Sequence, residues 1–151
     1  MSTSIEFLAA TELMRGVAGQ DLEIIADAMV ERKVDPGENI LAENEASCSL
    51  YLITDGQVRI SIGYPLKLKS DLPIRTLCAG EIFGEFAFID RLPRSASALS
   101  VTEARVLVLS REAFDRLAAE KPRLALALLQ NIAVTLTERI RDITALWRDS
   151  I

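Results

Sequence analysis

Histidine is absent from the 151-residue chain. Its imidazole is the commonest general base in enzymes and a frequent ligand of zinc, copper and iron. The absence argues against most metal-dependent sites and many acid–base catalytic sites. We therefore expect neither a metal cofactor nor an enzyme.

Cysteine is scarce, and long apolar runs are missing. Cys48 and Cys78 are the two cysteines, and the N-terminal stretch MSTSIEFLAATELMRGV lacks the basic flank of a secretory signal. Two reduced, structural thiols are expected, with a redox pair as the alternative. No apolar run approaches the roughly 20 residues that span a bilayer, which favours a cytoplasmic protein without membrane insertion.

Basic residues are in deficit. The chain has 17 Lys and Arg against 22 Asp and Glu, a formal net charge of −5. Sequence-independent affinity for nucleic acid comes mostly from basic side chains that neutralise phosphates. The charge therefore argues against a nucleic-acid partner.

Helical patterns occupy both ends of the chain, residues 1–31 and 111–151. Near the N-terminus an apolar stripe repeats at the spacing of one helix face: Leu22, Ile25, Ala26 and Met29. Near the C-terminus, Ser110 is expected to cap a helix over 111–119, and Pro122 to begin a longer one that reaches about Arg148. That helix carries an apolar seam: Leu129, Ile132, Leu136, Ile140, Ile143 and Trp147.

Short strands fill the middle, residues 32–110. Pro36-Gly37 is typical of a type II turn. Asp55-Gly56 predicts a hairpin between two strands, and the segment 64–73 is interpreted as a solvated connector. The expected strands are 50–54, 57–62, 74–77, 96–101 and 104–109. The pattern predicts an α+β fold, an antiparallel β-roll or jelly-roll barrel between N-terminal and C-terminal helices.

One stretch, FGEFAFIDRLPRSAS (residues 83–97), carries candidate binding chemistry. Gly84 lets the backbone approach a ligand, and the helical turn expected from Glu85 to Ile89 would offer free N–H groups to an anion. Arg94 can hold two phosphate oxygens, with the Ser95 hydroxyl beside it. Glu85 suits a hydroxyl on the same ligand. An acceptor, a cation and backbone donors together fit a nucleotide whose sugar and phosphate are held together, as in a cyclic nucleotide.

The same stretch resembles the phosphate-binding cassette of the cyclic nucleotide-binding domain family, F-G-E-x-A followed by P-R-x-A-S/T. Upstream, VDPGENIL and LYLITDGQVRI are similar to the family's early strands and glycine turn. The resemblance implies one such domain over 1–151, with N-terminal helices (1–31), a β-roll (32–110) that contains the cassette (83–97), and C-terminal lid helices (111–151). The chain resembles the sensor domain of catabolite-activator-type bacterial regulators. Because the chain ends at Ile151 without their DNA-binding domain, we expect a receptor that stands alone.

The resemblance also implies roles for individual residues. Glu85 would accept a hydrogen bond from the ribose 2′-hydroxyl, and Arg94 would pair with the cyclic phosphate. On the lid helix, Arg139 and Ile140 fall near the base-contact position, and Trp147 could cap the base. The full set of expected ligand-binding residues is Leu77, Phe83, Gly84, Glu85, Phe86, Ala87, Arg94, Ser95, Ala96, Ser97 and Arg139.

The expected function is a cyclic nucleotide sensor, for cyclic AMP more than cyclic GMP, that repositions its C-terminal helices. The preference for cyclic AMP rests on its wide use among bacterial members of the family, because Ser95 suits either base. The expected partners are an effector protein in trans or a second copy along the C-terminal helix. The alternative is a ligand-independent interaction domain with the same fold. A metal-dependent cupin is rejected because it needs histidines, and a transcription factor is disfavoured by length and charge.

Overall fold

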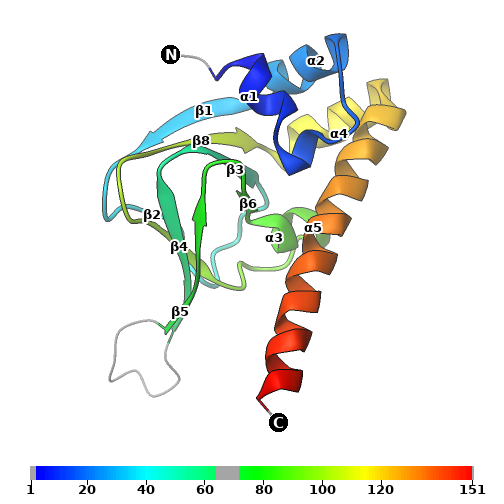
Figure 1. The fold of residues 1–151 in the computed structure, drawn as a ribbon. Coiled ribbons are helices and arrows are strands. Elements are labelled where there is room, and N and C mark those ends of the chain that lie inside the picture. The colour runs from blue at the N-terminus through cyan, green and yellow to red at the C-terminus, as the bar shows by residue number, and fades with distance from the viewer. Residues whose placement is uncertain (1–2, 64–71, 151) are drawn as a thin grey trace.

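The computed structural model describes residues 3–63 and 72–150. Of the connector expected at 64–73, residues 64–71 lie outside the described ranges, and residues 72 and 73 belong to a strand, so that part of the prediction is wrong. Two four-stranded antiparallel sheets, with strand orders β1-β8-β3-β6 and β2-β7-β4-β5, form a roll that is flanked by helices (Figure 1). The elements are α1 (Ile5–Ala9), the 3₁₀ helix η1 (Glu12–Met14), α2 (Gln20–Ala28), β1 (Val30–Val34), β2 (Asn39–Leu41), β3 (Leu50–Asp55), β4 (Gln57–Ile62), β5 (Leu72–Cys78), β6 (Ile82–Phe83), α3 (Glu85–Asp90), β7 (Ser97–Ser100), β8 (Ala104–Leu109), α4 (Arg111–Glu120) and α5 (Pro122–Asp149). The predicted α+β class with a helix-flanked roll is confirmed.

Several local predictions are confirmed. Gly37 has a φ of +81°, and the Glu38 N–H donates to the Asp35 carbonyl, as a turn at Pro36-Gly37 requires. The Ser110 hydroxyl accepts a hydrogen bond from the Ala113 N–H and caps α4. The N-terminal helices end earlier than expected, because Val30 and Glu31 already pair with β8.

The predicted hairpin at Asp55-Gly56 is wrong. β3 pairs with β6 and β8, whereas β4 pairs with β5 and β7 in the other sheet. The turn is where the chain crosses between sheets. Gly56 has a φ of +93°, and a Cβ there would lie 2.6 Å from the Glu103 carbonyl oxygen, so the crossing passes tightly over the start of β8. Turn chemistry fixes the local conformation but not which strands pair.

Two apolar cores give the molecule its layers. One lies between the sheets, and the other between the first sheet and the N-terminal and C-terminal helices. β3 serves both: Leu50 and Leu52 face the helices, while Tyr51 and Ile53 face the roll interior. Side chains of a strand alternate between faces, so burial on both faces explains its unbroken apolar run.

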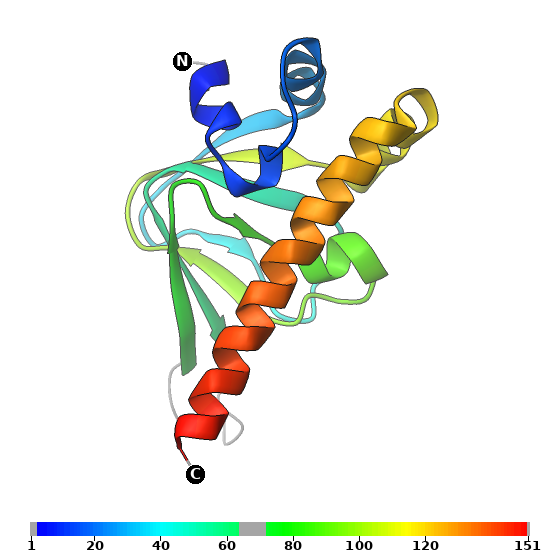
Figure 2. The ribbon, with the colours of Figure 1, turned by 45° about the vertical axis from the view of Figure 1, so that its right-hand side comes forward.

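The long helix α5 leads from the helical core to the roll (Figure 2). Its first half is anchored: Ile132 is buried, and the Asn131 side-chain amide donates to the carbonyls of Leu13 and Arg15. In its second half Ile140 and Trp147 are exposed, so the predicted seam is covered along only part of its length. Within residues 3–63 and 72–150, no helix combines the length and the hydropathy that a membrane span requires.

Candidate functional site

A cavity of about 520 Å³ lies between the second sheet, α3 and α5, and all eleven predicted site residues line it. The cassette forms one wall, Leu77 on β5 another, and Arg139 reaches in from α5. Residues from five different elements, β5, β6, α3, β7 and α5, thus meet at the position that the sequence pattern indicated. Their roles toward a ligand stay predictions.

Eight further lining residues were missed by sequence reasoning: Leu41, Ile60, Ile74, Arg75, Ala98, Asp142, Ile143 and Leu146. The alternation of Val58, Ile60 and Ile62 predicted the strand β4. It did not show which face of that strand would line a cavity. On α5 the predicted base contact is shifted. Ile140 and Trp147 do not line the cavity, whereas Ile143 and Leu146 do, because α5 turns that face toward the roll.

Arg94 is a nearly buried cation, 3% exposed, held by neutral acceptors. Its Nε donates to the Ser47 hydroxyl, Nη1 to the Gly84 carbonyl and Nη2 to the Ser49 carbonyl, each at 2.9 Å. No carboxylate lies within 4 Å of the guanidinium among residues 3–63 and 72–150. Burial lowers the pKa of Arg94 from its usual value, although arginine stays protonated in proteins. Three of its five N–H groups are engaged, which leaves two donors for an anion.

A stacked pair of aromatic rings lies beside the Arg94 guanidinium. Tyr51 stacks on Phe83 with ring centroids 4.9 Å apart, and the Arg94 Cζ lies 5.9 Å from the Tyr51 centroid. Gly84 fits tightly against the same group, because a Cβ there would lie 2.9 Å from the Arg94 Nη1, and its φ of +78° disfavours other residues. The glycine of the cassette is thus required by packing and by backbone conformation.

The first turn of α3 presents backbone donors to the cavity. Gly84 is the N-cap of this helix, and Phe86 and Ala87 follow within the first turn. The first N–H groups of a helix have no acceptor within it, so they remain available to an anion. Ser95 is exposed and lines the cavity, whereas the Ser97 hydroxyl accepts a hydrogen bond from the Glu43 N–H.

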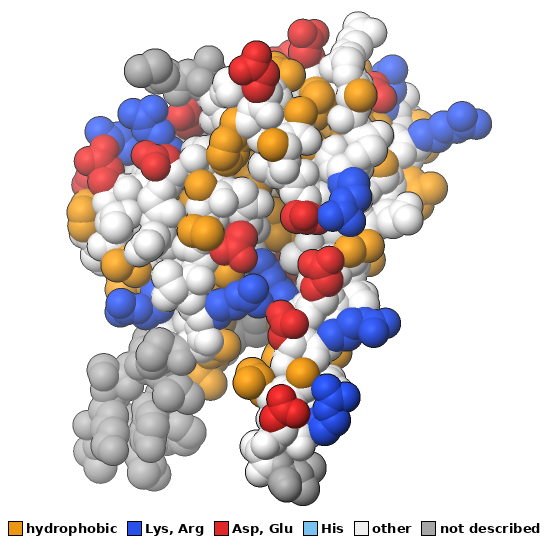
Figure 3. All heavy atoms as spheres, viewed as in Figure 1, with side chains coloured by type: hydrophobic (Ala, Val, Ile, Leu, Met, Phe, Trp, Pro, Cys, Tyr) orange, Lys and Arg blue, Asp and Glu red, His pale blue; other side chains and the backbone are white. Residues whose placement is uncertain are grey.

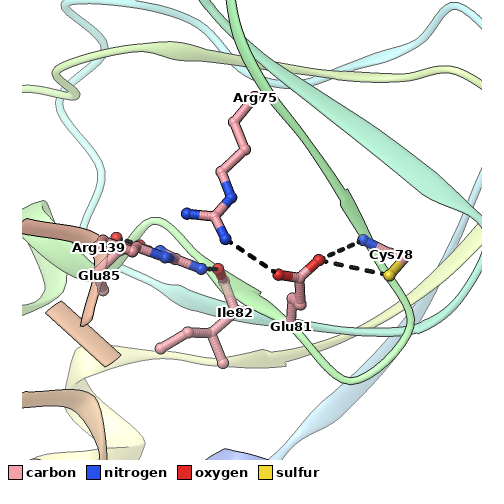
Figure 4. A network of polar contacts seen from close by, with 6 residues as sticks. All are labelled: Arg75, Cys78, Glu81, Ile82, Glu85 and Arg139. Atoms are coloured by element: carbon pink, nitrogen blue, oxygen red, sulfur yellow. Dashed lines mark hydrogen bonds and ion pairs between the residues drawn. The ribbon is translucent and has the colours of Figure 1, made fainter. Parts of the chain in front are cut away.

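Glu85 joins the cassette to α5. Its Oε1 pairs with the Arg139 Nη1 at 2.6 Å, and the Arg139 Nη2 donates to the Ile82 carbonyl at 2.6 Å (Figure 4). The two side chains are 9% and 18% exposed. One carboxylate oxygen is thus engaged by α5, and the other remains as an acceptor at the cavity.

A second polar group lies beside this pair. The Glu81 carboxylate accepts hydrogen bonds from the Cys78 N–H and thiol and lies 3.7 Å from the Arg75 guanidinium (Figure 4). Its hydrogen bond and negative charge raise the pKa of the Cys78 thiol. Cys78 and Cys48 are not joined in a disulfide, and Cys78 is exposed, so the expected structural role of these thiols stays a prediction. The described residues contain no cluster of three or more Cys, Asp or Glu that could hold a metal.

The raised pKa makes Cys78 a slow nucleophile, because only the thiolate reacts. Replacing Glu81 with glutamine should therefore speed the reaction of Cys78 with a disulfide reagent severalfold at neutral pH. The Cys48→Ser background restricts the measurement to one thiol. An unchanged rate would show that Glu81 does not control this thiol.

Comparisons with known proteins agree with this geometry. Residues 31–121 match the family model of the cyclic nucleotide-binding domain. The chain is 29% identical over 111 residues to a cAMP-dependent protein kinase regulatory subunit from Yarrowia lipolytica, covering 74% of this chain and 28% of that protein. It is 28% identical over 135 residues to the cyclic AMP receptor protein of Thermus thermophilus, covering 89% of this chain and 60% of that protein.

A solved structure shares the fold. A cyclic nucleotide-binding domain from Methylobacillus flagellatus superposes with a TM-score of 0.81 at 27% identity, covering 91% of this chain and 79% of that one. The chain spans less than two thirds of the length of both curated relatives described here. The matched family model includes the roll, the cassette and α4. The chain therefore belongs to the cyclic nucleotide-binding domain family.

Proposed function

We propose that this protein is a regulatory module that binds a cyclic nucleotide, cyclic AMP in preference to cyclic GMP, and signals through α5. The observation that carries the proposal is Arg94, a buried cation whose hydrogen-bond partners among the described residues are all neutral, at one end of a largely apolar cavity. Burying a charge is costly unless it is paired, so the site favours an anion. A singly charged cyclic phosphate supplies that anion without bringing excess charge.

The cavity divides into regions that suit the parts of such a ligand. Arg94, Ser95 and the N–H groups of Phe86 and Ala87 would hold the phosphate, and Glu85 the ribose hydroxyl. The apolar side chains of the second sheet and α5 would enclose the purine: Leu41, Ile60, Ile74, Leu77, Ile143 and Leu146. Apolar walls with a few converging polar groups are typical of small-molecule sites.

Adenine is favoured by the relatives rather than by the cavity. Both curated relatives described above are named for cyclic AMP. Ser95 can meet a phosphate or a guanine equally well, so it favours neither base. Cyclic GMP is therefore the competing ligand to be compared with cyclic AMP by thermal unfolding and by calorimetry.

Signalling would pass through α5. Its contact with Glu85 makes the position of Arg139 sensitive to what the carboxylate binds. Beyond Arg139, two exposed apolar residues that do not line the cavity could contact an effector protein or a second copy of the chain: Ile140 and Trp147. Charged side chains of both signs lie along the exposed side of α5 (Figure 3), and the net charge of −5 disfavours nucleic acid. We place this non-catalytic module in the cytoplasm.

A ligand-independent interaction domain is the second candidate. Arg139 already engages Glu85, and Ser47, Gly84 and Ser49 already accept from Arg94. A protein that needs no ligand would fill its polar contacts in this way. Ligand binding separates the two candidates.

Thermal unfolding with added ligand tests the proposal. A ligand present at about 100 times its Kd stabilises the folded state by about 2.7 kcal/mol. For a chain of this size that raises Tm by roughly 5–10 °C. Cyclic AMP should produce this shift, cyclic GMP a smaller one, and 5′-AMP almost none. No shift with either cyclic nucleotide would favour the second candidate.

Replacing Arg139 with alanine should destabilise the protein by about 1–2 kcal/mol, because the largely buried Glu85 carboxylate loses its charged partner. Urea unfolding measures the change. Arg141→Ala removes the same charge at a neighbouring exposed position of α5 and should cost much less. Equal losses in the two variants would mean that the pair with Glu85 contributes nothing.

A further inference from the structure

The far end of the cassette helix is fixed to α4 by a second charged cluster. The Asp115 carboxylate on α4 accepts from the Arg111 Nε at 3.0 Å and from the Arg91 Nη2 at 2.9 Å. Arg111 belongs to α4, whereas Arg91 is the C-cap of α3. One carboxylate therefore holds groups from both helices. The hydrogen bond from Arg111 lowers the pKa of Asp115, which keeps the carboxylate ionised at neutral pH.

Arg111 also reaches α3 directly. Its Nη1 donates to the Phe88 carbonyl at 2.6 Å, and its Cζ lies 5.5 Å from the ring centroids of Phe88 and Phe114. The two rings meet edge to face with centroids 5.2 Å apart, and both are buried. A cation is favourable near the carboxyl end of a helix. The contact between α3 and α4 thus consists of packed aromatic rings with charged hydrogen bonds at its edge.

Arg91 adopts a conformation that its side chain disfavours. Its φ is +60°, in the left-handed region where glycine and asparagine are more usual. Helices often end on a residue in this region, usually glycine, and here an arginine occupies the position. In this structure the Arg91 side chain ends on Asp115.

These contacts connect α3 to α4 and, through α5, back to the start of α3. The N-terminal turn of α3 lines the cavity, its C-terminal end is fixed to α4, and α4 leads through Lys121 into α5. α5 then returns to the start of α3 through Arg139 and Glu85. Both ribbon views place α3 beside the middle of α5 (Figures 1 and 2).

We infer that Asp115 is a positioning residue that makes α4 follow the cassette helix when a cyclic nucleotide binds. This rests on the proposed function. The cassette would have two separate links to the C-terminal helices, Glu85–Arg139 to α5 and the Asp115 cluster to α4. Neither Arg91 nor Arg111, the two partners of Asp115, lines the cavity, so Asp115→Asn removes the charged link from Arg91 to α4 and leaves the binding groups in place. The packing of Phe88 on Phe114 and the Arg111 contact with the Phe88 carbonyl remain, so the variant tests the charged link alone.

Hydrogen exchange with and without saturating cyclic AMP tests this link. In the wild type, the ligand should slow exchange both in the cassette (83–97) and in α4 (111–120), by at least about fivefold in α4, the lower end of ordinary coupling factors. Asp115→Asn should retain the effect in the cassette and lose it in α4. Glu112→Gln, which removes a charge from an exposed position of the same helix, should behave as the wild type does.

A second variant distinguishes the loss of this contact from a folding defect in Asp115→Asn. Arg91→Asn removes the other arm of the cluster, and asparagine tolerates the left-handed backbone. It should also lose the response in α4. Wild-type slowing of α4 in either variant, with the cassette still protected, overturns the inference.

The wild-type result separates this inference from the function on which it rests. If cyclic AMP protects the cassette but never α4, the link is wrong and the proposed function stands. If it protects neither segment, both are wrong.

Discussion

Arg94→Ala should weaken cyclic AMP binding by about 2–4 kcal/mol, which is roughly 30- to 1,000-fold in Kd. The guanidinium is buried at the cassette end of the cavity, and a phosphate there would form charge-assisted hydrogen bonds with it. Calorimetric titration of the variant and the wild type measures the difference. Arg94→Lys keeps the charge but loses the fork of donors, so its affinity should fall between the two.

Two controls separate lost affinity from lost structure. Arg94 also binds Ser47, Gly84 and Ser49, so each variant needs a thermal unfolding curve before its affinity is interpreted. Arg59→Ala removes the same charge from an exposed position on β4 and should leave Kd unchanged. A folded Arg94→Ala variant with wild-type affinity would contradict the assignment of the phosphate site.

Glu85→Ala should make the protein insensitive to the ribose 2′-hydroxyl. A hydrogen bond from a hydroxyl to a carboxylate contributes about 1.5–3 kcal/mol. The wild type should therefore bind 2′-deoxy cyclic AMP about 10- to 150-fold more weakly than cyclic AMP. The variant should bind both ligands with similar, weakened affinity.

Comparing two ligands isolates the ribose contact from the other role of Glu85. The variant also loses its ion pair with Arg139, and that loss affects both titrations equally, so it cancels in the cycle. If the variant discriminated between the ligands as strongly as the wild type, the hydroxyl would be bound elsewhere.

Local chemistry made much of the fold predictable. Ser110 and Pro122 fix helix starts through capping and backbone geometry, and Gly37 fixes a turn through its positive φ. These signals lie within a few residues of their effect. The partners of β3 do not, because Asp55-Gly56 forms the same kind of tight turn whether the chain continues in one sheet or crosses to the other.

The candidate site was likewise predictable from the sequence only in part. The cassette is contiguous in sequence, so its residue chemistry and its resemblance to the family motif identified Gly84, Glu85 and Arg94 together. Ile143 and Leu146 were missed because the rotation of α5 about its axis decides which of its apolar residues face the roll. That rotation depends on long-range contacts such as Asn131 with the carbonyls of Leu13 and Arg15, which no local pattern shows. The neutral acceptors around Arg94 were equally hidden, since Ser47 and Ser49 lie far from it in sequence.

Calorimetric titration of the purified, nucleotide-stripped protein with cyclic AMP, and then with cyclic GMP, tests the central claim most directly. We predict saturable binding at one site per chain, with micromolar or tighter affinity for cyclic AMP and weaker affinity for cyclic GMP. The absence of binding heat with both ligands at several temperatures would contradict the account and leave a cyclic nucleotide-binding fold that acts without its ligand.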